Sequence, residues 1–392
     1  MSIKFTPPLP VLQVFIFYNP NSGNRQGRHL ENFKGQFVRL KKYPLVQIQM
    51  FNILEKDDYN LGFAYLATLY NDKDNSVNIV VCSAGGDGTF VSILEKLCQM
   101  NISISSTRIS FSVFPFGTGN DLSQALEWEH VLHNHHTKNF DIFCDYVLLR
   151  INGNKKKMDI WKVKVETNGI QGSIEQSPGI DLNGKLERMM CNYMTFGVQG
   201  LVGYGFERHR HRSRLMNIVE YIRQCIKIVI LGKIERVPDY FESIETPDKN
   251  RYYLNEKSLK QSHVEVLIQN IQGIWGRQIN LWDTTRKNKK QNSILTPPIG
   301  MAAEETWTNT NMGDGKLEVF TIRSRLDYAI KQIKCLSRFS KLSKMGQFYC
   351  NFRINCLPET KFHMMVDGEF YKMYDISHID ISHVACITML TR

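Results

Sequence analysis

The sequence lacks any long apolar segment. The longest early apolar run, residues 11–18, has eight residues and is interrupted by Gln13. A helix that spans a bilayer needs about 20 apolar residues, so no part of the chain is expected to cross a membrane. The first ten residues hold three prolines and no apolar core, Ser2 replaces the glycine of a myristoylation signal, and the chain ends Leu-Thr-Arg rather than in a prenylation signal. Any contact with a membrane is therefore expected to be peripheral.

Cysteine pairs with zinc-binding spacing are also missing. The nine cysteines include no Cys-x-x-Cys pair, so neither a zinc module nor a disulfide framework is expected, and we predict reduced thiols in a cytoplasmic protein. Lys and Arg exceed Asp and Glu, 49 to 38, which gives a formal net charge of +11. This balance favours anionic partners, namely phosphates, nucleic acid or an acidic membrane surface. Nucleic acid is not expected, because the chain has no recognition motif and its basic residues do not interleave with aromatic ones.

The first third of the chain alternates apolar strands with amphipathic helices. Strands are predicted over residues 11–18, 46–54, 77–82 and 109–114. Helices are predicted over residues 30–40, 61–70 and 90–100, where apolar residues recur every three or four positions. This alternation predicts right-handed βαβ units and a doubly wound parallel sheet that helices cover on both faces.

Beyond about residue 155, β-rich runs predominate. They occupy residues 160–165, 264–268, 317–322, 361–366 and 379–390, and long polar connections such as 168–185 separate them. Helices are expected at roughly 213–231 and 326–345. We therefore predict an α/β protein with two domains, residues 1–155 and a mostly antiparallel domain over 156–392. In a variant of this prediction the last strand or strands return to the first domain.

Glycine-rich turns follow three of the predicted strands. They are NPNSG at 19–23, GGDGT at 85–89 and GTGND at 117–121. In doubly wound sheets, ligands bind beyond the carboxyl ends of the strands. Glycine lets the backbone approach a ligand closely, and the N–H groups that open the next helix favour a phosphate. Ser22, Thr89 and Thr118 add hydroxyl donors, and Arg25 and Arg28 follow the first turn, where they can pair with a phosphate.

Two carboxylates, Asp87 and Asp121, lie inside these turns. Acids beside a phosphate-binding backbone indicate a bridging cation, and Mg²⁺ prefers one or two carboxylates together with phosphate oxygens and water. The first domain is therefore predicted to bind a nucleotide with Mg²⁺ for phosphoryl transfer. The alternative for any single turn is an ordinary connection, with glycine for the turn and Asp or Asn as the helix cap. The P-loop and GxGxxG fingerprints are both missing.

These turns belong to longer segments that resemble the catalytic domain of eukaryotic-type diacylglycerol kinases. The segments are NPNSG at 19–23, SAGGDGTF at 83–90 and PFGTGNDLSQAL at 115–126. The resemblance continues into that family's second, accessory region, with MDIWKV at 158–163, CNYMTFGVQGLVGYGFERHRHRSRLMN at 191–217, IWGRQINLWD at 274–283, MGDGKLEVFTI at 312–322 and VDGEFY at 366–371. It covers most of the chain from about residue 12, in the family's order.

The resemblance implies an ATP-dependent lipid kinase that converts diacylglycerol in membranes to phosphatidic acid with Mg²⁺. It implies a phosphofructokinase-like α/β domain followed by a β-sandwich domain on the lipid side, with ATP and lipid meeting between them. The residues that it implies for the nucleotide and its phosphates are Asn19, Ser22, Gly23, Gly85, Gly86, Gly88, Thr89, Gly117, Thr118, Gly119 and Asn120.

The resemblance also implies roles for the acidic residues. Asp87 and Asp121 would organise Mg²⁺ and water at the γ-phosphate, and Glu369 in VDGE would act as general base on the lipid hydroxyl. Asp87 is the competing base, because related sphingoid-base kinases assign that work to the aspartate of GGDG. Asp314 resembles an acid that holds a structural Mg²⁺ in bacterial relatives, although a β-turn role in Gly-Asp-Gly is an equal alternative. Gln199 stands where the family usually has Asp.

Two basic segments are candidates for an anionic phospholipid surface. Arg208, Arg210, Arg212 and Arg214 alternate with histidines and lead into residues 218–231, which are apolar on one side. The second segment is 286–290, for which a solvated loop is the favoured interpretation. Basic residues at an anionic leaflet contribute about 1 kcal/mol each. The first segment suits either a membrane or a phosphate, and the oligomeric state is left open.

Two other functions remain as alternatives to a diacylglycerol kinase. A sphingoid-base, ceramide or other lipid kinase, or more distantly an NAD kinase, would keep the fold and change the acceptor; the terminal aspartate of GTGND favours the diacylglycerol branch. A catalytically silent protein that binds lipid as a scaffold is the other possibility, and the presence of Asp87, Asp121 and Glu369 argues against it.

Overall fold

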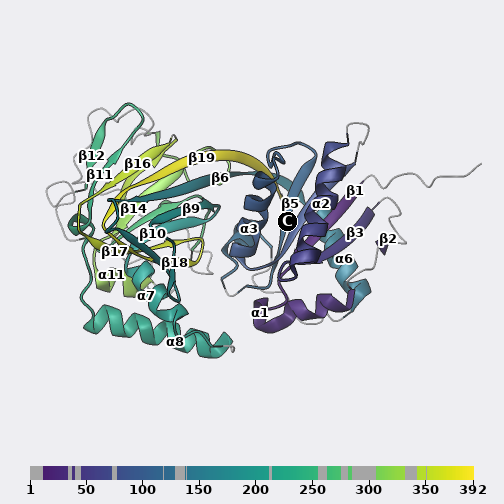
Figure 1. The fold of residues 1–392 in the computed structure, drawn as a ribbon, viewed down its shortest axis with the longest axis horizontal. Coiled ribbons are helices and arrows are strands. Elements are labelled where there is room, and N and C mark those ends of the chain that lie inside the picture. The colour runs from purple at the N-terminus through teal and green to yellow at the C-terminus, as the bar shows by residue number, and fades with distance from the viewer. Residues whose placement is uncertain are drawn as a thin grey trace, which may run out of the picture. The chain divides into compact units, whose positions relative to one another are not determined.

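The computed structural model describes residues 12–33, 38–39, 46–72, 77–117, 119–128, 137, 139–211, 214–254, 263–274, 281–284, 306–331, 342–349 and 351–392. The chain divides into two units (Figure 1). Unit 1 comprises residues 1–157 and 387–392, and unit 2 comprises residues 158–386. Strands β6 (Asn154–Thr167) and β19 (Ile376–Thr391) each begin in one unit and end in the other.

Unit 1 is built on a parallel sheet. Its central strands run in the order β5 (Ile109–Pro115), β4 (Asn78–Gly85), β1 (Leu12–Tyr18) and β3 (Val46–Asn52), and each neighbouring pair is parallel. The short β2 (Val38–Arg39) pairs antiparallel with β3 at one edge. At the other edge the end of β19 lies parallel to β5, with Met389 opposite Phe111. The carboxyl ends of β1, β4 and β5 therefore lie at the same edge of the sheet.

Helices cover both faces of this sheet. They are α1 (Ser22–Arg25), α2 (Lys56–Asn71), α3 (Asp87–Gln99), α4 (Asp121–Ala125) and α6 (Phe140–Ile151). Side chains of β1 alternate between the two faces. Phe17 stacks on Phe63 of α2 with 4.3 Å between ring centroids, whereas Ile16 shares a buried cluster with Phe143 of α6. The predicted doubly wound parallel sheet is therefore confirmed.

Two predicted helices are only partly correct. Of the predicted helix 30–40, residues 30–33 belong to a 3₁₀ helix, η1 (Gln26–Phe33), and Val38 and Arg39 belong to β2. Leu30 and Phe33 are buried, and their spacing of three residues suits the three residues per turn of a 3₁₀ helix. The predicted helix 326–345 is helical as α11 (Arg325–Lys331), but Leu342–Phe348 forms β15, whose hydrogen bonds to β14 (Leu317–Ile322) outweigh its local pattern.

Unit 2 contains two antiparallel sheets. In the first, β12 (Arg251–Tyr253), β11 (Phe241–Glu245), β16 (Phe352–Cys356) and β19 are neighbours in that order, and β6 joins β19 to β9 (Lys185–Met190). The second has the order β15, β14, β13 (Glu265–Gln269), β10 (Tyr193–Gly197), β17 (Lys361–Val366), β18 (Glu369–Tyr374), β7 (Ser173–Gln176) and β8 (Ile180–Asp181). Strands β7 and β8 lie within residues 168–185, which the sequence analysis treats as a connection.

A shared apolar core joins the two sheets into a sandwich. Trp161, Ile354 and Ile379 of the first sheet belong to one buried cluster with Phe196 and Val266 of the second. The elements outside the sandwich are α7 (Val198–Glu207), α8 (Arg214–Ile226), the π-helical η2 (Lys227–Leu231), η3 (Val237–Asp239), α10 (Leu281–Thr284) and α11. The predicted antiparallel sandwich with a few helices is confirmed.

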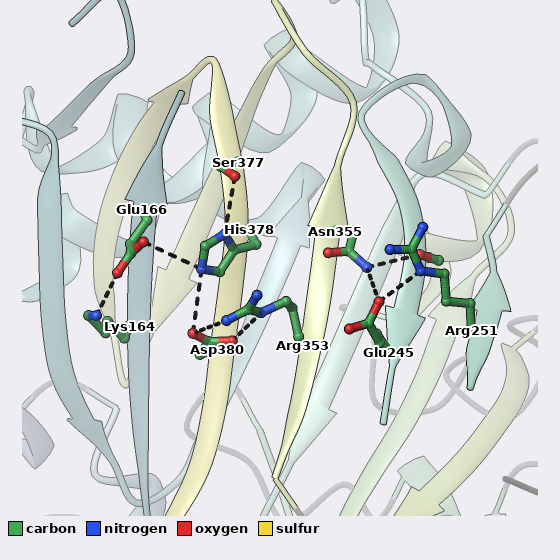
Figure 2. A network of polar contacts seen from close by, with 10 residues as sticks. Lys164, Glu166, Glu245, Arg251, Arg353, Asn355, Ser377, His378 and Asp380 are labelled. Carbon is green, nitrogen blue, oxygen red and sulfur yellow. Dashed lines mark hydrogen bonds and ion pairs between the residues drawn. The ribbon is translucent and has the colours of Figure 1, made fainter. Parts of the chain in front are cut away.

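The outer face of the first sheet carries a row of polar contacts that cross the strands (Figure 2). Arg353 of β16 and Asp380 of β19 form two hydrogen bonds, of 2.7 and 3.0 Å. The Nε2 atom of His378 lies 3.5 Å from Asp380 and 3.6 Å from Glu166 of β6. Farther along, Arg251 pairs with Glu245 at 2.7 Å. Opposite charges on neighbouring strands favour this register.

Two expectations about the whole chain concern membranes and thiols. In the described part of the chain, no helix is long and apolar enough to span a bilayer. The cysteines that the structure describes are thiols outside any disulfide, and they are Cys82, Cys98, Cys144, Cys191, Cys225, Cys356 and Cys386. Neither finding assigns a compartment.

Candidate functional site

The first glycine turn, after β1, is held against the neighbouring strand. The backbone N–H of Asn19 donates to the carbonyl of Ala84 at 2.9 Å, and the N–H of Ser22 donates to the carbonyl of Asn19 at 3.1 Å. A Cβ atom on Gly27 would lie 2.2 Å from that same carbonyl oxygen, so only glycine fits there. Gly27 is thus a residue of this turn that the sequence analysis did not select. Arg25 is exposed at the end of α1, with a φ of 67°.

The second and third turns pack directly against each other. The N–H groups of Phe116 and Gly117 donate to the carbonyl of Gly85 at 3.0 and 3.2 Å. A Cβ on Gly117 would lie 2.6 Å from the Cα of Gly86 and 2.7 Å from Oδ1 of Asn120. The glycines at these positions therefore let two backbones approach each other, which is a structural reason for part of the motif.

The two predicted carboxylates meet at this contact. Asp87 opens α3 and Asp121 opens α4, and Oδ2 of Asp87 accepts the backbone N–H of Asp121 at 2.9 Å. Asn120 takes a left-handed conformation with φ 52°, and its side-chain amide donates to the carbonyl of Gly117 at 2.8 Å. Asp121 is buried and Asp87 is half-buried. The aspartate of the second turn thus holds the backbone of Asp121 in the third turn.

The remaining predicted residues of the two turns differ in their surroundings. Thr89 is buried, and its hydroxyl fills the space next to Gly85, since a Cβ there would lie 2.3 Å from Oγ1. Its N–H bonds to the carbonyl of Gly86 at 3.0 Å. Gly88 and Gly119 are half-buried. Thr118 lies outside the described residues, so its predicted contact with phosphate stays a prediction.

The donor set at this edge suits a magnesium-bound phosphate. Asp87 and Asp121 supply hard oxygen ligands next to backbone N–H groups, which is the combination that a phosphate-bound Mg²⁺ takes in proteins. Among the described residues, no three His, Cys, Asp or Glu side chains are grouped to bind a metal by themselves. A metal here would therefore draw its other ligands from phosphate and water.

Glu369, the predicted general base, belongs to unit 2. It opens β18, and its Oε2 accepts hydrogen bonds from Gln176 at 3.0 Å, from the hydroxyl of Tyr371 at 2.8 Å and from Arg188. Within the described part of the chain, its Oε1 has no hydrogen-bond partner. The carboxylate is therefore fixed through one oxygen, while the other has lone pairs for a substrate proton.

Asp367, two residues earlier, has a structural task that the sequence analysis missed. It is buried, and its carboxylate accepts the backbone N–H groups of Cys191 at 2.6 Å, Asn192 at 2.9 Å and Tyr193 at 3.0 Å. Burial raises the pKa of Asp367, and the three N–H donors oppose that rise. The sequence does signal a turn here, because Asp-Gly favours positive φ, and Asp367 has φ 46°.

Asp314 lies in a turn that Asp159 holds in place. The N–H of Lys316 donates to Oδ1 of Asp314 at 3.1 Å, and the Lys316 amine lies 4.0 Å from Oδ2. Asp159 is buried and accepts the N–H of Gly315 at 2.6 Å. Burial raises the pKa of Asp314, and the N–H of Lys316 opposes the rise. These contacts explain a turn residue without a metal, and the magnesium role of Asp314 stays a prediction.

Gln199 is buried inside unit 2. Its Oε1 accepts the hydroxyls of Tyr328 at 2.8 Å and Tyr221 at 3.3 Å. A neutral amide therefore stands where the family pattern has a charged residue, and two phenols satisfy it. The substitution is matched by its surroundings.

Family comparisons agree with the motifs. A model of the diacylglycerol kinase catalytic domain matches residues 13–163, and a model of the diacylglycerol kinase accessory domain matches residues 189–370. A Caenorhabditis elegans protein assigned as diacylglycerol kinase 3 is 25% identical over 365 residues, which are 91% of this chain and 41% of that protein. The eye-specific diacylglycerol kinase of Drosophila melanogaster is 28% identical over 255 residues, 61% of this chain and 15% of that protein.

A plant relative and a solved structure extend the comparison. Diacylglycerol kinase 4 of Arabidopsis thaliana is 30% identical over 247 residues, 54% of this chain and 48% of that protein. The chain thus spans less than half the length of these relatives. A crystal structure from Bacillus anthracis, of a protein assigned as a diacylglycerol kinase, matches with a TM-score of 0.52 at 15% identity, over 100% of this chain and 99% of the other. That match shows the fold, and the two domain models together show that this chain belongs to the diacylglycerol kinase family.

Proposed function

We propose that this chain is an ATP-dependent kinase that phosphorylates the primary hydroxyl of 1,2-diacylglycerol to give phosphatidic acid. The observation that carries the proposal is the contact between the second and third glycine turns, where Asp87 accepts the N–H of Asp121 at 2.9 Å. Two acids and several backbone N–H groups then share one edge of a parallel sheet, which suits the phosphates of a nucleotide with Mg²⁺. Membership of the diacylglycerol kinase family supports the lipid acceptor.

In this proposal unit 1 binds the nucleotide. Asn19, Ser22 and Arg25 of the first turn, together with the glycine turns after β4 and β5, surround the phosphates. Asp87 and Asp121 hold Mg²⁺, which neutralises phosphate charge when it is bound. The backbone N–H groups of the turns orient the phosphates. Because Asp121 is buried, its carboxylate is held in one position.

Transfer of the phosphoryl group needs a proton acceptor for the lipid hydroxyl. The hydroxyl oxygen forms a bond to the γ-phosphorus, the bond from that phosphorus to the bridging oxygen breaks, and ADP leaves. We assign the hydroxyl proton to Glu369, because Oε2 is held by Arg188, Gln176 and Tyr371 while Oε1 is available. Asp87 is the other candidate base.

The proposal includes a cytoplasmic protein that meets its substrate at an anionic membrane surface. Part of the first basic segment is already paired within unit 2. Arg208 contacts Glu175 at 2.9 Å and Arg210 contacts Glu207 at 3.0 Å. Arg212, the Arg214 side chain and residues 286–290 lie outside the described part. Pairing lowers the free charge of this segment but leaves the arginines half-exposed.

The experiment is phosphate transfer from labelled ATP with Mg²⁺ to a lipid panel in mixed micelles. Diacylglycerol, monoacylglycerol, ceramide and sphingosine are compared side by side. Transfer to diacylglycerol above all others is expected. Preference for another lipid would show that the protein is a lipid kinase and that diacylglycerol is not its acceptor. Transfer to none of them, by protein whose melting temperature rises with Mg·ATP, would contradict the kinase proposal and favour the scaffold.

A further inference from the structure

Helix α8 turns a row of large apolar side chains to solvent. The most deeply buried of its described side chains are Asn217, Glu220 and Gln224, and the half-buried Tyr221 and Cys225 pack beside them on an apolar cluster of unit 2. Its large apolar side chains are exposed, with accessible fractions of 48% for Met216, 46% for Ile218, 58% for Val219, 51% for Ile222 and 52% for Ile226. A surface helix normally does the opposite and turns its apolar stripe to the core.

The polar face cannot simply roll outward, because specific contacts hold it. Oδ1 of Asn217 accepts the backbone N–H of His211 at 2.7 Å, and the amide of Gln224 donates to Glu220 at 2.7 Å. The helix packs on α7, where a Cβ on Gly205 would lie 2.9 Å from Oε1 of Gln224. The close approach of α7 and the buried hydrogen bonds therefore fix which face of α8 points outward. Figure 1 shows α7 and α8 next to each other in unit 2.

The exposed apolar side chains form one continuous stripe. Val219, Ile222 and Ile226 are spaced three and four residues apart, so they lie on one face of the helix, with Ile218 and Met216 on its flanks. Scattered single apolar residues need no partner, but a contiguous row marks an interaction surface. The stripe runs from Met216 to Ile226, eleven residues of helix, which is about 16 Å.

Charge next to the stripe selects the partner. Residues 205–233 contain seven Lys or Arg and two Glu, a formal charge of +5. Arg223 of α8, with 64% of its side chain exposed, and the exposed Lys227, which opens η2 directly after α8, border the stripe. Arg223 also pairs with Glu220 at 3.1 Å. Basic residues that border an apolar stripe suit the headgroup region of an anionic bilayer. A second protein copy is less suitable, because a stable interface needs roughly 800 Å² from each partner and this stripe is a single row.

We propose that the outward face of α8 inserts into the interface of an anionic membrane, with Val219, Ile222 and Ile226 among the acyl chains and Arg223 and Lys227 at the headgroups. This surface rests in part on the proposed function, because a lipid acceptor brings the protein to a bilayer. The helix lies in the plane of the membrane and does not cross it.

The test is flotation of the full chain with vesicles, without ATP. Vesicles of phosphatidylcholine alone are compared with vesicles that contain about 30 mol% phosphatidylserine. Val219→Gln/Ile222→Gln should weaken binding to the anionic vesicles about tenfold or more, because two apolar side chains leave the interface. Glutamine is a better helix former than valine or isoleucine, so α8 should persist, and the circular dichroism spectrum checks this. Ile170→Gln, at a fully exposed isoleucine elsewhere in unit 2, is the control and should bind as wild type.

Three results would overturn the proposal that the apolar stripe of α8 binds the membrane. Wild-type binding that the double variant leaves unchanged excludes α8. An equal loss with Ile170→Gln makes the effect non-specific. Sedimentation that shows a wild-type dimer and a monomeric double variant assigns the stripe to a second copy. Failure of the proposed function looks different, because the wild type would then bind anionic vesicles and still transfer phosphate to no lipid in micelles.

Discussion

Two carboxylates stand two residues apart at the turn between β17 and β18, and their surroundings separate their roles. Asp367 is buried and accepts three backbone N–H groups from residues 191–193. Glu369 is held through one oxygen and retains 28% of its side-chain exposure. The first arrangement ties two segments of unit 2 together, whereas the second leaves a lone pair for chemistry.

This difference predicts that an isosteric substitution of Asp367 lowers mainly stability, whereas that of Glu369 lowers mainly activity. Asp367→Asn should lower the free energy of unfolding by about 2–4 kcal/mol, because an amide would turn a donor toward a backbone N–H in a buried site. Glu369→Gln should cost about 1 kcal/mol or less, because its ion pair is partly exposed, and should lower kcat with little change in the affinity for ATP. Denaturant unfolding and steady-state kinetics on both variants measure this. Loss of ATP binding in Glu369→Gln would assign that residue a structural role.

His363 on β17 predicts a pH dependence of stability. Burial, with help from Lys361 and Lys372, lowers the pKa of His363 to about 4. The unfolded chain takes up this proton near pH 6.5, so its protonation favours unfolding as the pH falls from 6.5 toward 4. His363→Met cannot take up the proton.

The variant should therefore lose less stability than wild type between pH 8 and pH 5, by about 2 kcal/mol. Denaturant unfolding at the two pH values gives the difference. Parallel losses in the two proteins would show that His363 is protonated in the folded state as readily as in the unfolded one.

At the scale of elements, the glycine turns serve packing, besides the phosphate binding that we propose for them. Gly86 and Gly117 face each other, but the room at the two positions differs. A Cβ on Gly117 would lie 2.6 Å from the Cα of Gly86, whereas a Cβ on Gly86 would lie 3.4 Å from its nearest neighbour. At this contact, position 117 therefore requires glycine more strictly than position 86.

Gly117→Ala should accordingly destabilise unit 1 by about 1–3 kcal/mol, and Gly86→Ala by clearly less. The two variants are matched, because each adds one methyl group to the same contact. Thermal unfolding with and without Mg·ATP compares them. Equal melting temperatures would mean that the turns move apart without cost.

The spacing of apolar residues and the types of residue in the turns predict most elements of unit 1. In two segments of the chain, however, this local pattern predicts the wrong type of element. Strand β4 ends at Gly85, and β5 ends two residues before Gly117, so the ends of these apolar runs can be predicted from the sequence. The sequence predicts one helix over residues 30–40, since apolar spacings of three and four suit a 3₁₀ helix and an α-helix alike. Leu342–Phe348 was partly assigned to a helix because only pairing with β14, twenty residues earlier, makes it a strand.

At the scale of the whole molecule, the chain returns to unit 1 at its end. Residues 387–392 belong to unit 1, where Ile387, Met389 and Leu390 are buried. The indole N–H of Trp128 donates to the carbonyl of Leu390 at 2.9 Å, and the hydroxyl of Thr391 donates to the carbonyl of Leu126 at 2.7 Å. The last strand thus completes the edge of the sheet beside β5.

Deletion of residues 387–392 should therefore unfold unit 1 selectively. Unit 2 contains its own two-sheet core and should remain folded. Limited proteolysis with mass spectrometry should find new cleavage sites within residues 12–157 only. Thr391→Ala, which removes one hydrogen bond and keeps the strand, is the control. A deletion variant with the wild-type digestion pattern would contradict the role of this strand.

The sequence located the candidate site better than it explained it. GGDGT and GTGND predicted a phosphate site at strand ends, but only the fold shows that they touch and that Asp87 caps the helix opened by Asp121. The sequence does not predict the role of Asp367, because the backbone groups that it binds, in residues 191–193, are remote in sequence. The exposure of the apolar stripe of α8 was also hidden, since a helical pattern gives the stripe and not the face that is buried.

The central claim is that the contact between the turns of unit 1 is a phosphoryl-transfer site, and Asp87→Asn tests it most directly. The asparagine can still accept the N–H of Asp121, so the turn should keep its structure while one negative charge is lost. The measurement is the rate of labelled phosphate transfer from Mg·ATP to diacylglycerol in mixed micelles, for wild type and for Asp87→Asn. The melting temperatures of the two proteins are compared first and should be equal. A fall of about a hundredfold or more is predicted, with Asp141→Asn, an exposed acid on α6, unchanged. Wild-type rates in Asp87→Asn would contradict the account.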